Sequence, residues 1–109
     1  MDEAKFITLD NCLTILIYTD RSKSTNHMEL FTFYGGNYSS YIDYNGKKRN
    51  IKEGSAHLLE HYVCENTVSG DLLDNLRKYN VLSCNAGTSA FNTSYFFNTV
   101  CNFYECLDT

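Results

Sequence analysis

The sequence contains no proline, no tryptophan and no long hydrophobic run. Its first apolar run, residues 13–18, is far too short to cross a bilayer. The chain opens on the acidic residues Asp2 and Glu3, which is not the pattern of a secretory signal. We therefore expect a cytoplasmic protein that does not enter a membrane.

Basic residues are few and scattered, with nine Lys and Arg against 13 Asp and Glu and a formal net charge of -4. The one basic cluster is Lys47, Lys48 and Arg49, and we expect it to lie in a loop. Binding to nucleic acid normally requires a basic stripe or patch. Nucleic acid is therefore not an expected partner.

The five cysteines show no C-x-x-C spacing, and their number is odd. Both features argue against a disulfide framework and against a zinc site made of four thiolates. Free cysteines behave mostly as small buried hydrophobic residues. We expect this of Cys12, Cys64, Cys84, Cys101 and Cys106.

What is abundant is apolar and aromatic: hydrophobic residues make up 43%, including nine tyrosines and seven phenylalanines. This composition is sufficient for one modest domain with a core, and it suits packed strands better than a coiled coil. Alternating or continuous apolar runs predict five strands. They cover residues 6–9, 13–18, 29–34, 82–89 and 93–99, and a long polar loop with a turn at Asn45-Gly46 covers residues 37–53.

Three helices are predicted from apolar spacing and capping residues. The first covers residues 55–64 with Ser55 as N-cap, and the second covers residues 70–79 with Ser69 as N-cap. A third begins at Asn102, where the N-x-x-E pattern is typical of a capping box. Because this helix starts within two turns of residue 109, we expect the domain to be incomplete.

The first predicted helix contains His57, Glu60 and His61. At 100° per residue these three side chains and Cys64 share one face of the helix. The opposite face is apolar and consists of Leu58, Leu59, Tyr62 and Val63. We expect the apolar face to pack on a sheet and the polar face to present both imidazoles to a cleft.

Two histidines at positions i and i+4 can bind one Zn²⁺ from the same side of a helix. Zinc lowers the pKa of a bound water towards about 7, and a nearby carboxylate can accept its proton. His57 and His61 are therefore candidate metal ligands, and Glu60 is the candidate general base. An ordinary solvated helix face is the alternative interpretation of the same three residues.

The segment "GSAHLLEH" (residues 54–61) resembles the H-x-x-E-H signature of the inverzincin metallopeptidases, the pitrilysin or insulin-degrading enzyme (insulinase) family. Two further segments are similar to that family in order and spacing. "LDNCLTILIY" (9–18) resembles its opening strands, and "NAGTSAFNTSYFF" (85–97) resembles the strand pair that follows its metal helix. From the first to the last, the three segments span most of the chain from residue 9 onward.

The resemblance implies an α+β fold, a partial α/β roll with an antiparallel-rich sheet and helices on one face. Residues 1–109 would be the N-terminal part of a peptidase domain whose downstream half is absent. The implied function is that of a zinc metalloendopeptidase that hydrolyses peptide bonds. Asn85 and Ala86 would lie on the strand that pairs with the extended substrate. The implied partners are a peptide or small protein substrate and a second, similar half in the same chain or another subunit.

The sequence also departs from the family pattern. The family's third zinc ligand is a glutamate on a later helix, beyond the positions that this sequence covers, and a catalytic zinc needs three protein ligands. We expect weak zinc binding and little turnover from these residues alone. Two interpretations of Cys64 stay open, a substitute zinc ligand and a packed thiol. Cys12 replaces the usual turn glycine, which predicts strain in the first hairpin.

Two other functions remain open. One is a non-catalytic subunit or peptide-binding module of the same fold, and the other is a truncated product without function. His27 has no partner at metal-ligand spacing, and we expect it to lie at the surface. Asn85 could instead be a buried amide that bonds to its own backbone.

Overall fold

The computed structural model describes residues 3–109, and these form seven strands and three helices. In chain order they are β1 (Glu3–Thr8), β2 (Thr14–Thr19), β3 (Asn26–Thr32), β4 (Ser40–Ile42), β5 (Lys48–Asn50), α1 (Ser55–Glu65), α2 (Leu72–Arg77), β6 (Ser83–Thr88), β7 (Thr93–Thr99) and α3 (Phe103–Leu107). None of the helices in this range is long and apolar enough to span a membrane.

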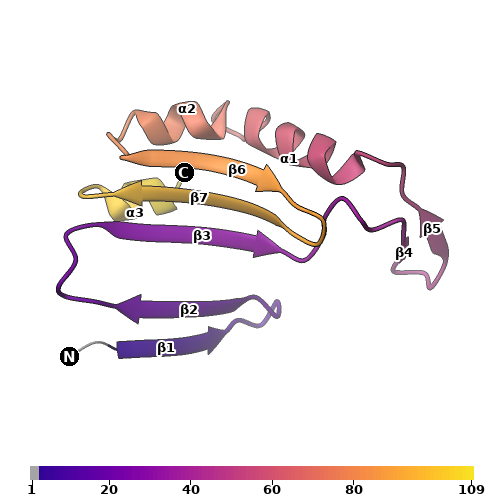
Figure 1. Ribbon diagram of the computed structural model, residues 1–109, viewed down its shortest axis with the longest axis horizontal. Coiled ribbons are helices and arrows are strands. Elements are labelled where there is room, and N and C mark those ends of the chain that lie inside the picture. The colour runs from indigo at the N-terminus through magenta and orange to yellow at the C-terminus, as the bar shows by residue number, and fades with distance from the viewer. Residues whose placement is uncertain (1–2) are drawn as a thin grey trace.

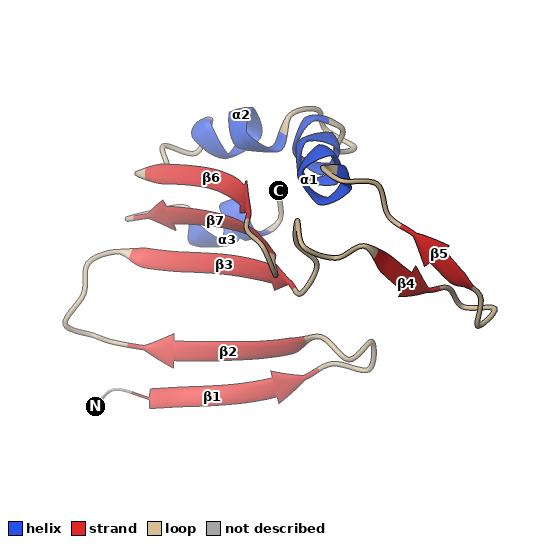
Figure 2. Cartoon of the chain, turned by 45° about the vertical axis from the view of Figure 1, so that its right-hand side comes forward, coloured by secondary structure: helices blue, strands red, loops and turns tan. Residues whose placement is uncertain are grey.

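The central element is an antiparallel sheet in the order β3-β7-β6. Two separate hairpins, β1-β2 and β4-β5, lie outside it, and Figure 1 shows α1 and α2 following one another beside β6. Figure 2 shows the β4-β5 hairpin projecting away from the sheet beyond α1. The structure confirms the predicted α+β fold with an antiparallel sheet.

The core lies where α2 and α3 meet the sheet. Leu76 of α2, Phe97 of β7 and Cys106 of α3 are buried together, and the rings of Phe97 and Phe103 are 5.7 Å apart between centroids. Partly buried apolar side chains surround this group: Met28, Leu72, Leu73, Val81, Cys84 and Phe103. Because Met28, Cys84 and Phe97 all contribute, the helices cover the same face of all three strands.

All five predicted strands are present; the last has its predicted boundaries, and those of the other four are shifted. The third begins at Asn26, three residues earlier than predicted, and ends at Thr32. The predicted polar loop was wrong in part, because it contains the β4-β5 hairpin. Lys48 and Arg49 belong to β5, and Arg49 binds the Asp43 carboxylate at 2.9 Å. The hairpin consists of short polar strands, which apolar periodicity does not reveal.

Two of the three predicted helix caps were wrong, and the third, Asn102, is in the predicted place. Gly54, with φ 82°, is the N-cap of α1 in place of Ser55. Asp71 caps α2 in place of Ser69, and its carboxylate accepts the backbone N–H three residues further on. Asn102 is the N-cap of α3, but its side chain makes no cap hydrogen bond. Both Ser69 and Asp71 precede α2, so local preference alone does not choose between them.

The first hairpin has the strained position that its sequence predicts. Cys12 lies in the β1–β2 turn with φ 69°, in the left-handed region that favours glycine. Its N–H donates to the carbonyl of Leu9 at 2.9 Å, which holds the turn in this conformation. A side chain in this region costs about 1–2 kcal/mol relative to the usual backbone conformation.

The segment after β3 passes very close to the β6–β7 turn. Gly35 is buried there, and a Cβ at this position would lie 2.6 Å from the Ser89 carbonyl oxygen. The next amide, of Gly36, donates to that same carbonyl at 2.8 Å. Glycine is therefore required at position 35, and the contact fixes the end of β3 against the end of β6.

Candidate metal centre

Helix α1 packs on the sheet through a narrow stripe of residues four positions apart. Ala56, Glu60 and Cys64 are its buried residues. Ala56 and Cys64 are small, so the helix backbone can approach β6 closely. Glu60 lies between them and carries the polar group that must be satisfied inside this contact.

The prediction of which face of α1 would be buried was therefore wrong. The apolar face remains exposed, with Leu58 72% and Tyr62 63% accessible. Leu59 and Val63 are exposed as well. A helical wheel ranks faces by hydrophobicity, but here the sheet offers Thr88 as a partner for Glu60. Small residues and one satisfied carboxylate decided the packing.

His57 and His61 point outward side by side on the next part of the helix surface. Their Nε2 atoms are 3.0 Å apart, and their ring centroids are 4.7 Å apart. Both side chains are well exposed, at 66% and 57%. The structure thus brings the Nε2 atoms of the two predicted ligands together on a surface that an ion can reach.

This pair fits a zinc ion. Two histidine nitrogens at about 2.0–2.1 Å from a tetrahedral zinc lie about 3.3 Å from one another. The observed Nε2–Nε2 separation of 3.0 Å is within a few tenths of an ångström of that value. Small rotations of two exposed rings are enough to accept the metal.

Two glutamates flank the histidine pair in different ways. The Glu60 Oε2 lies 4.0 Å from the His57 Nε2, and its side chain is 9% exposed. The Glu65 Oε1 lies 3.8 Å from Nδ1 of His61, the nitrogen that faces away from the pair. Glu60 is thus placed beside the candidate metal position, whereas Glu65 can only orient the ring of His61. Among residues 3–109, no group of three or more His, Cys, Asp or Glu side chains is arranged to hold a metal.

Cys64 is packed beneath the helix as one of its buried residues. Burial raises the pKa of its thiol, and the negative charge of Glu60 raises this pKa further. A thiol must lose its proton to bind zinc. The environment therefore favours the packed, protonated cysteine over the metal ligand.

We expect thiol labelling to separate the cysteines by burial. Cys12 and Cys101 are exposed and should react rapidly with a thiol reagent at about pH 8, near the usual thiol pKa. Cys64 and Cys106 are buried and should react only after denaturation, because burial raises the pKa of both. Mass spectrometry after timed labelling measures this.

A Cys12→Ser, Cys101→Ser variant is the matched control, and it should lose the rapid phase. Rapid labelling of Cys64 in the folded protein would contradict its packed position. Protection of Cys64 by zinc alone would instead favour the ligand interpretation.

The two predicted substrate-binding residues lie on β6, which is an edge strand of its sheet. Among the described residues β6 pairs only with β7, so its outer edge has no strand partner along Ser83–Thr88. The side chain of Asn85 is exposed, and its Oδ1 accepts the N–H of Ala86 at 2.9 Å. Of the alternative interpretation of Asn85, the bond to its own backbone is present, but the burial is not.

Thr88, at the end of β6, is the residue at this site that sequence reasoning missed. Its Oγ1 lies 3.0 Å from the Glu60 Oε2, across 28 residues of sequence. A threonine in a strand is ordinary, and no local pattern marks it as the partner of a helix residue. Only the resemblance of "NAGTS" to a family segment drew attention to this part of the chain.

His27 lies at the surface, as predicted, although it does have partners. Its Nδ1 is 2.7 Å from the Asn98 Oδ1, and its Nε2 is 3.2 Å from the Glu29 Oε2. These contacts hold the exposed ring on the sheet, on a different element from the histidine pair of α1.

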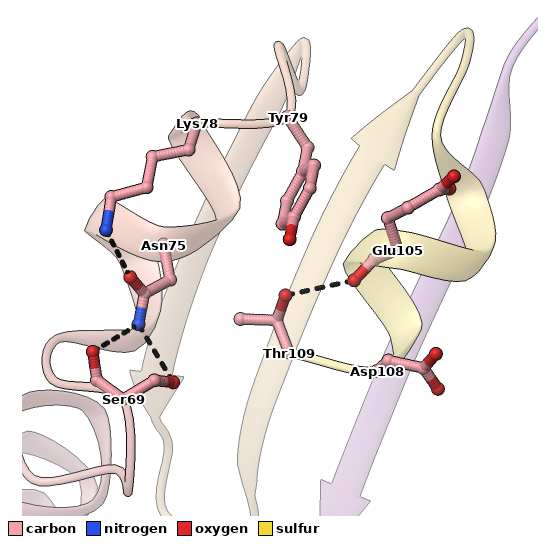
Figure 3. Close-up of a pocket in the computed structure, with 7 residues that line it drawn as sticks. All are labelled: Ser69, Asn75, Lys78, Tyr79, Glu105, Asp108 and Thr109. Atoms are coloured by element: carbon pink, nitrogen blue, oxygen red, sulfur yellow. Dashed lines mark hydrogen bonds between the residues drawn. The ribbon is translucent and has the colours of Figure 1, made fainter.

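A separate polar pocket lies between α2 and α3 (Figure 3). The Asn75 amide donates to the carbonyl and to the hydroxyl of Ser69 and accepts from Lys78, and Thr109 donates to the carbonyl of Glu105. These polar groups are used in holding the helix ends. His57, His61 and Glu60 do not line this pocket, so the candidate site remains on α1.

Comparisons with known proteins support the fold. No protein-family model matches the chain, and no curated protein matches it. Among solved structures, it is similar to a protein from Alicyclobacillus acidocaldarius described as an M16-like peptidase, with a TM-score of 0.86 and 20% sequence identity. The match covers 97% of this chain and 24% of that chain. The chain therefore has the fold of part of an M16/insulinase-like peptidase.

Proposed function

We propose that this chain is part of a zinc-dependent metalloendopeptidase. The observation that carries the proposal is the convergence of His57 and His61 through nitrogens 3.0 Å apart, beside the buried carboxylate of Glu60. The likeness of the fold to an M16-like peptidase supports it. A chance pair of surface histidines would not need to face each other through their Nε2 atoms. It would also not need a buried acid beside it.

The residues of the chain divide the chemistry between them. When bound, zinc polarises the peptide carbonyl and lowers the pKa of water towards about 7. His57 and His61 would hold the metal through their Nε2 atoms. Glu60 accepts the proton of the attacking water and returns it to the departing amine nitrogen.

The free edge of β6 supports the proposed binding of a peptide substrate. An extended peptide can add to an exposed strand edge through backbone hydrogen bonds, which give affinity without much sequence preference. Ala86 lies on this edge, where a peptide would replace the Asn85 Oδ1 as the partner of its N–H, and α1 lies next to β6 (Figure 1). A peptide paired with Asn85 and Ala86 would run beside the helix that carries the histidines.

We further propose that a third zinc ligand comes from outside residues 1–109, in the same polypeptide or in another subunit. A catalytic zinc site has three protein ligands and one open position. With His57 and His61 alone, zinc binding should be weak and hydrolysis negligible. A second half of similar fold is the proposed source of the ligand.

Zinc titration tests the proposed ligands directly. We expect the 109-residue chain to bind one Zn²⁺ weakly, with a Kd in the micromolar range or above, and His61→Ala to weaken binding by about tenfold or more, equivalent to about 1.4 kcal/mol. Isothermal titration calorimetry measures both. His27→Ala is the matched control, because it removes a surface histidine from another element.

Equal loss of binding in His61→Ala and His27→Ala would contradict a site on α1. Tight stoichiometric binding by the unaltered chain would contradict the need for an external ligand. Peptide binding at β6 without any zinc binding would favour the non-catalytic module of the same fold.

A further inference from the structure

We propose that Thr88 is a positioning residue for Glu60, a role that rests on the proposed function. Its hydroxyl lies 3.0 Å from the Glu60 Oε2, at the contact between α1 and β6. The Glu60 side chain is almost completely buried, and a buried carboxylate needs hydrogen bonds to offset the loss of water. Thr88 supplies that bond from the sheet.

The hydroxyl of Thr88 belongs to a short chain of contacts. Its Oγ1 also lies 3.3 Å from the Thr93 Oγ1, and the Thr93 hydroxyl donates to the carbonyl of Tyr34 at 2.9 Å. Thr93 is buried. The position of Thr88 is therefore fixed from behind by β7 and by the segment that follows β3.

The number of available hydrogens decides which of these contacts can be hydrogen bonds. An ionised carboxylate only accepts, and each hydroxyl has one hydrogen to donate. The Thr93 hydroxyl donates its hydrogen to the Tyr34 carbonyl. The Thr88 hydroxyl therefore donates its own to the Glu60 carboxylate. In this state the contact between Thr88 and Thr93 has no hydrogen.

When Glu60 has accepted a proton from water, it becomes a donor to the Thr88 Oγ1. The hydrogen of Thr88 then turns to the Thr93 Oγ1, and each of the three contacts carries one hydrogen. No other proton enters or leaves this series of contacts. The same hydroxyl thus pairs with Glu60 before and after proton transfer, which suits a base that must hold a proton briefly and release it.

Thr88 also keeps Glu60 away from the metal position. The Glu60 Oε2 is only 4.0 Å from the His57 Nε2, so a carboxylate released from β6 could turn towards the histidine pair. There it would become a metal ligand and could no longer act as a base. The Thr88 hydroxyl therefore keeps Glu60 available as a base and prevents it from becoming a metal ligand.

The test compares Thr88→Val, which keeps the shape without the hydroxyl, with Thr88→Ser, which keeps the hydroxyl. In the 109-residue chain we expect Thr88→Val to bind Co²⁺ more tightly by about threefold or more, with a changed visible spectrum, because an added carboxylate ligand strengthens a divalent metal site. Thr88→Ser should behave as the unaltered chain. Thr14→Val, an exposed strand threonine, is the matched control.

In the assembled peptidase, Thr88→Val should lower kcat by about 10–100-fold with little change in KM, and Thr88→Ser should restore it. A purely structural role would lower the amount of folded enzyme and leave kcat per folded molecule unchanged, and that result would overturn the proposal. If both proteins bind Co²⁺, identical affinities and spectra in Thr88→Val and the unaltered chain would overturn it as well.

Metal-free crystal structures of the same variants keep the two proposals separate. We expect the Glu60 carboxylate to leave its position in Thr88→Val and to keep it in Thr88→Ser. If no variant binds a metal, the zinc proposal fails while the Glu60 position still decides the role of Thr88. An unmoved Glu60 in Thr88→Val overturns that role.

Discussion

Glu60→Gln is expected to abolish hydrolysis by the assembled peptidase, with kcat reduced by about 10³-fold, within the range of general-base contributions. The amide has the shape of the carboxylate but cannot accept a proton from water. It can still accept the hydrogen bond from Thr88, so the fold of the α1–β6 contact should survive. Because His57 and His61 are unchanged, zinc content should remain that of the unaltered enzyme.

The measurement is kcat and KM for a fluorogenic peptide, together with zinc content by elemental analysis. Glu65→Gln is the matched control, because it makes the same change on the same helix at an exposed side chain near Nδ1 of His61. Its activity should stay within a few-fold of the unaltered enzyme, as for a partner that only orients a ligand. Full activity in Glu60→Gln would remove Glu60 from the mechanism.

Phe97→Ala is expected to have the largest effect on stability, a loss of about 3–5 kcal/mol in the free energy of unfolding. The Phe97 side chain is 1% exposed and lies between Leu76, Cys106 and the ring of Phe103. It therefore connects β7 with both α2 and α3, and its removal leaves a cavity at their junction. Domains of this size have about 5–15 kcal/mol in total, so the loss is a large fraction of the stability.

Urea denaturation followed by circular dichroism measures this difference. Phe33→Ala is the matched control, because it is the same substitution at a side chain that is 86% exposed, and it should change stability by less than about 0.5 kcal/mol. Similar losses for both variants would show that Phe97 is not the centre of the core.

Much of the secondary structure could be predicted from local patterns. The strands around the first turn and the pair joined at residues 89–92 were recognised because apolar runs and turn residues alternate there. The short β4-β5 hairpin was missed because its strands are polar and owe their position to contacts such as that of Arg49 with Asp43. The capping error at α2 has a related cause, since Ser69 and Asp71 both precede this helix and the path of the chain selects Asp71.

The candidate site divides in the same way. The sequence by itself determined that His57 and His61 would meet, because residues four apart on one helix are neighbours whatever surrounds the helix. Only the tertiary structure decided which face of α1 would be buried and that Glu60 would be bound by Thr88. That contact joins a helix and a strand 28 residues apart, and its energy depends on the close approach of Ala56 and Cys64 to the sheet. Local spacing carries no information about such a distant partner.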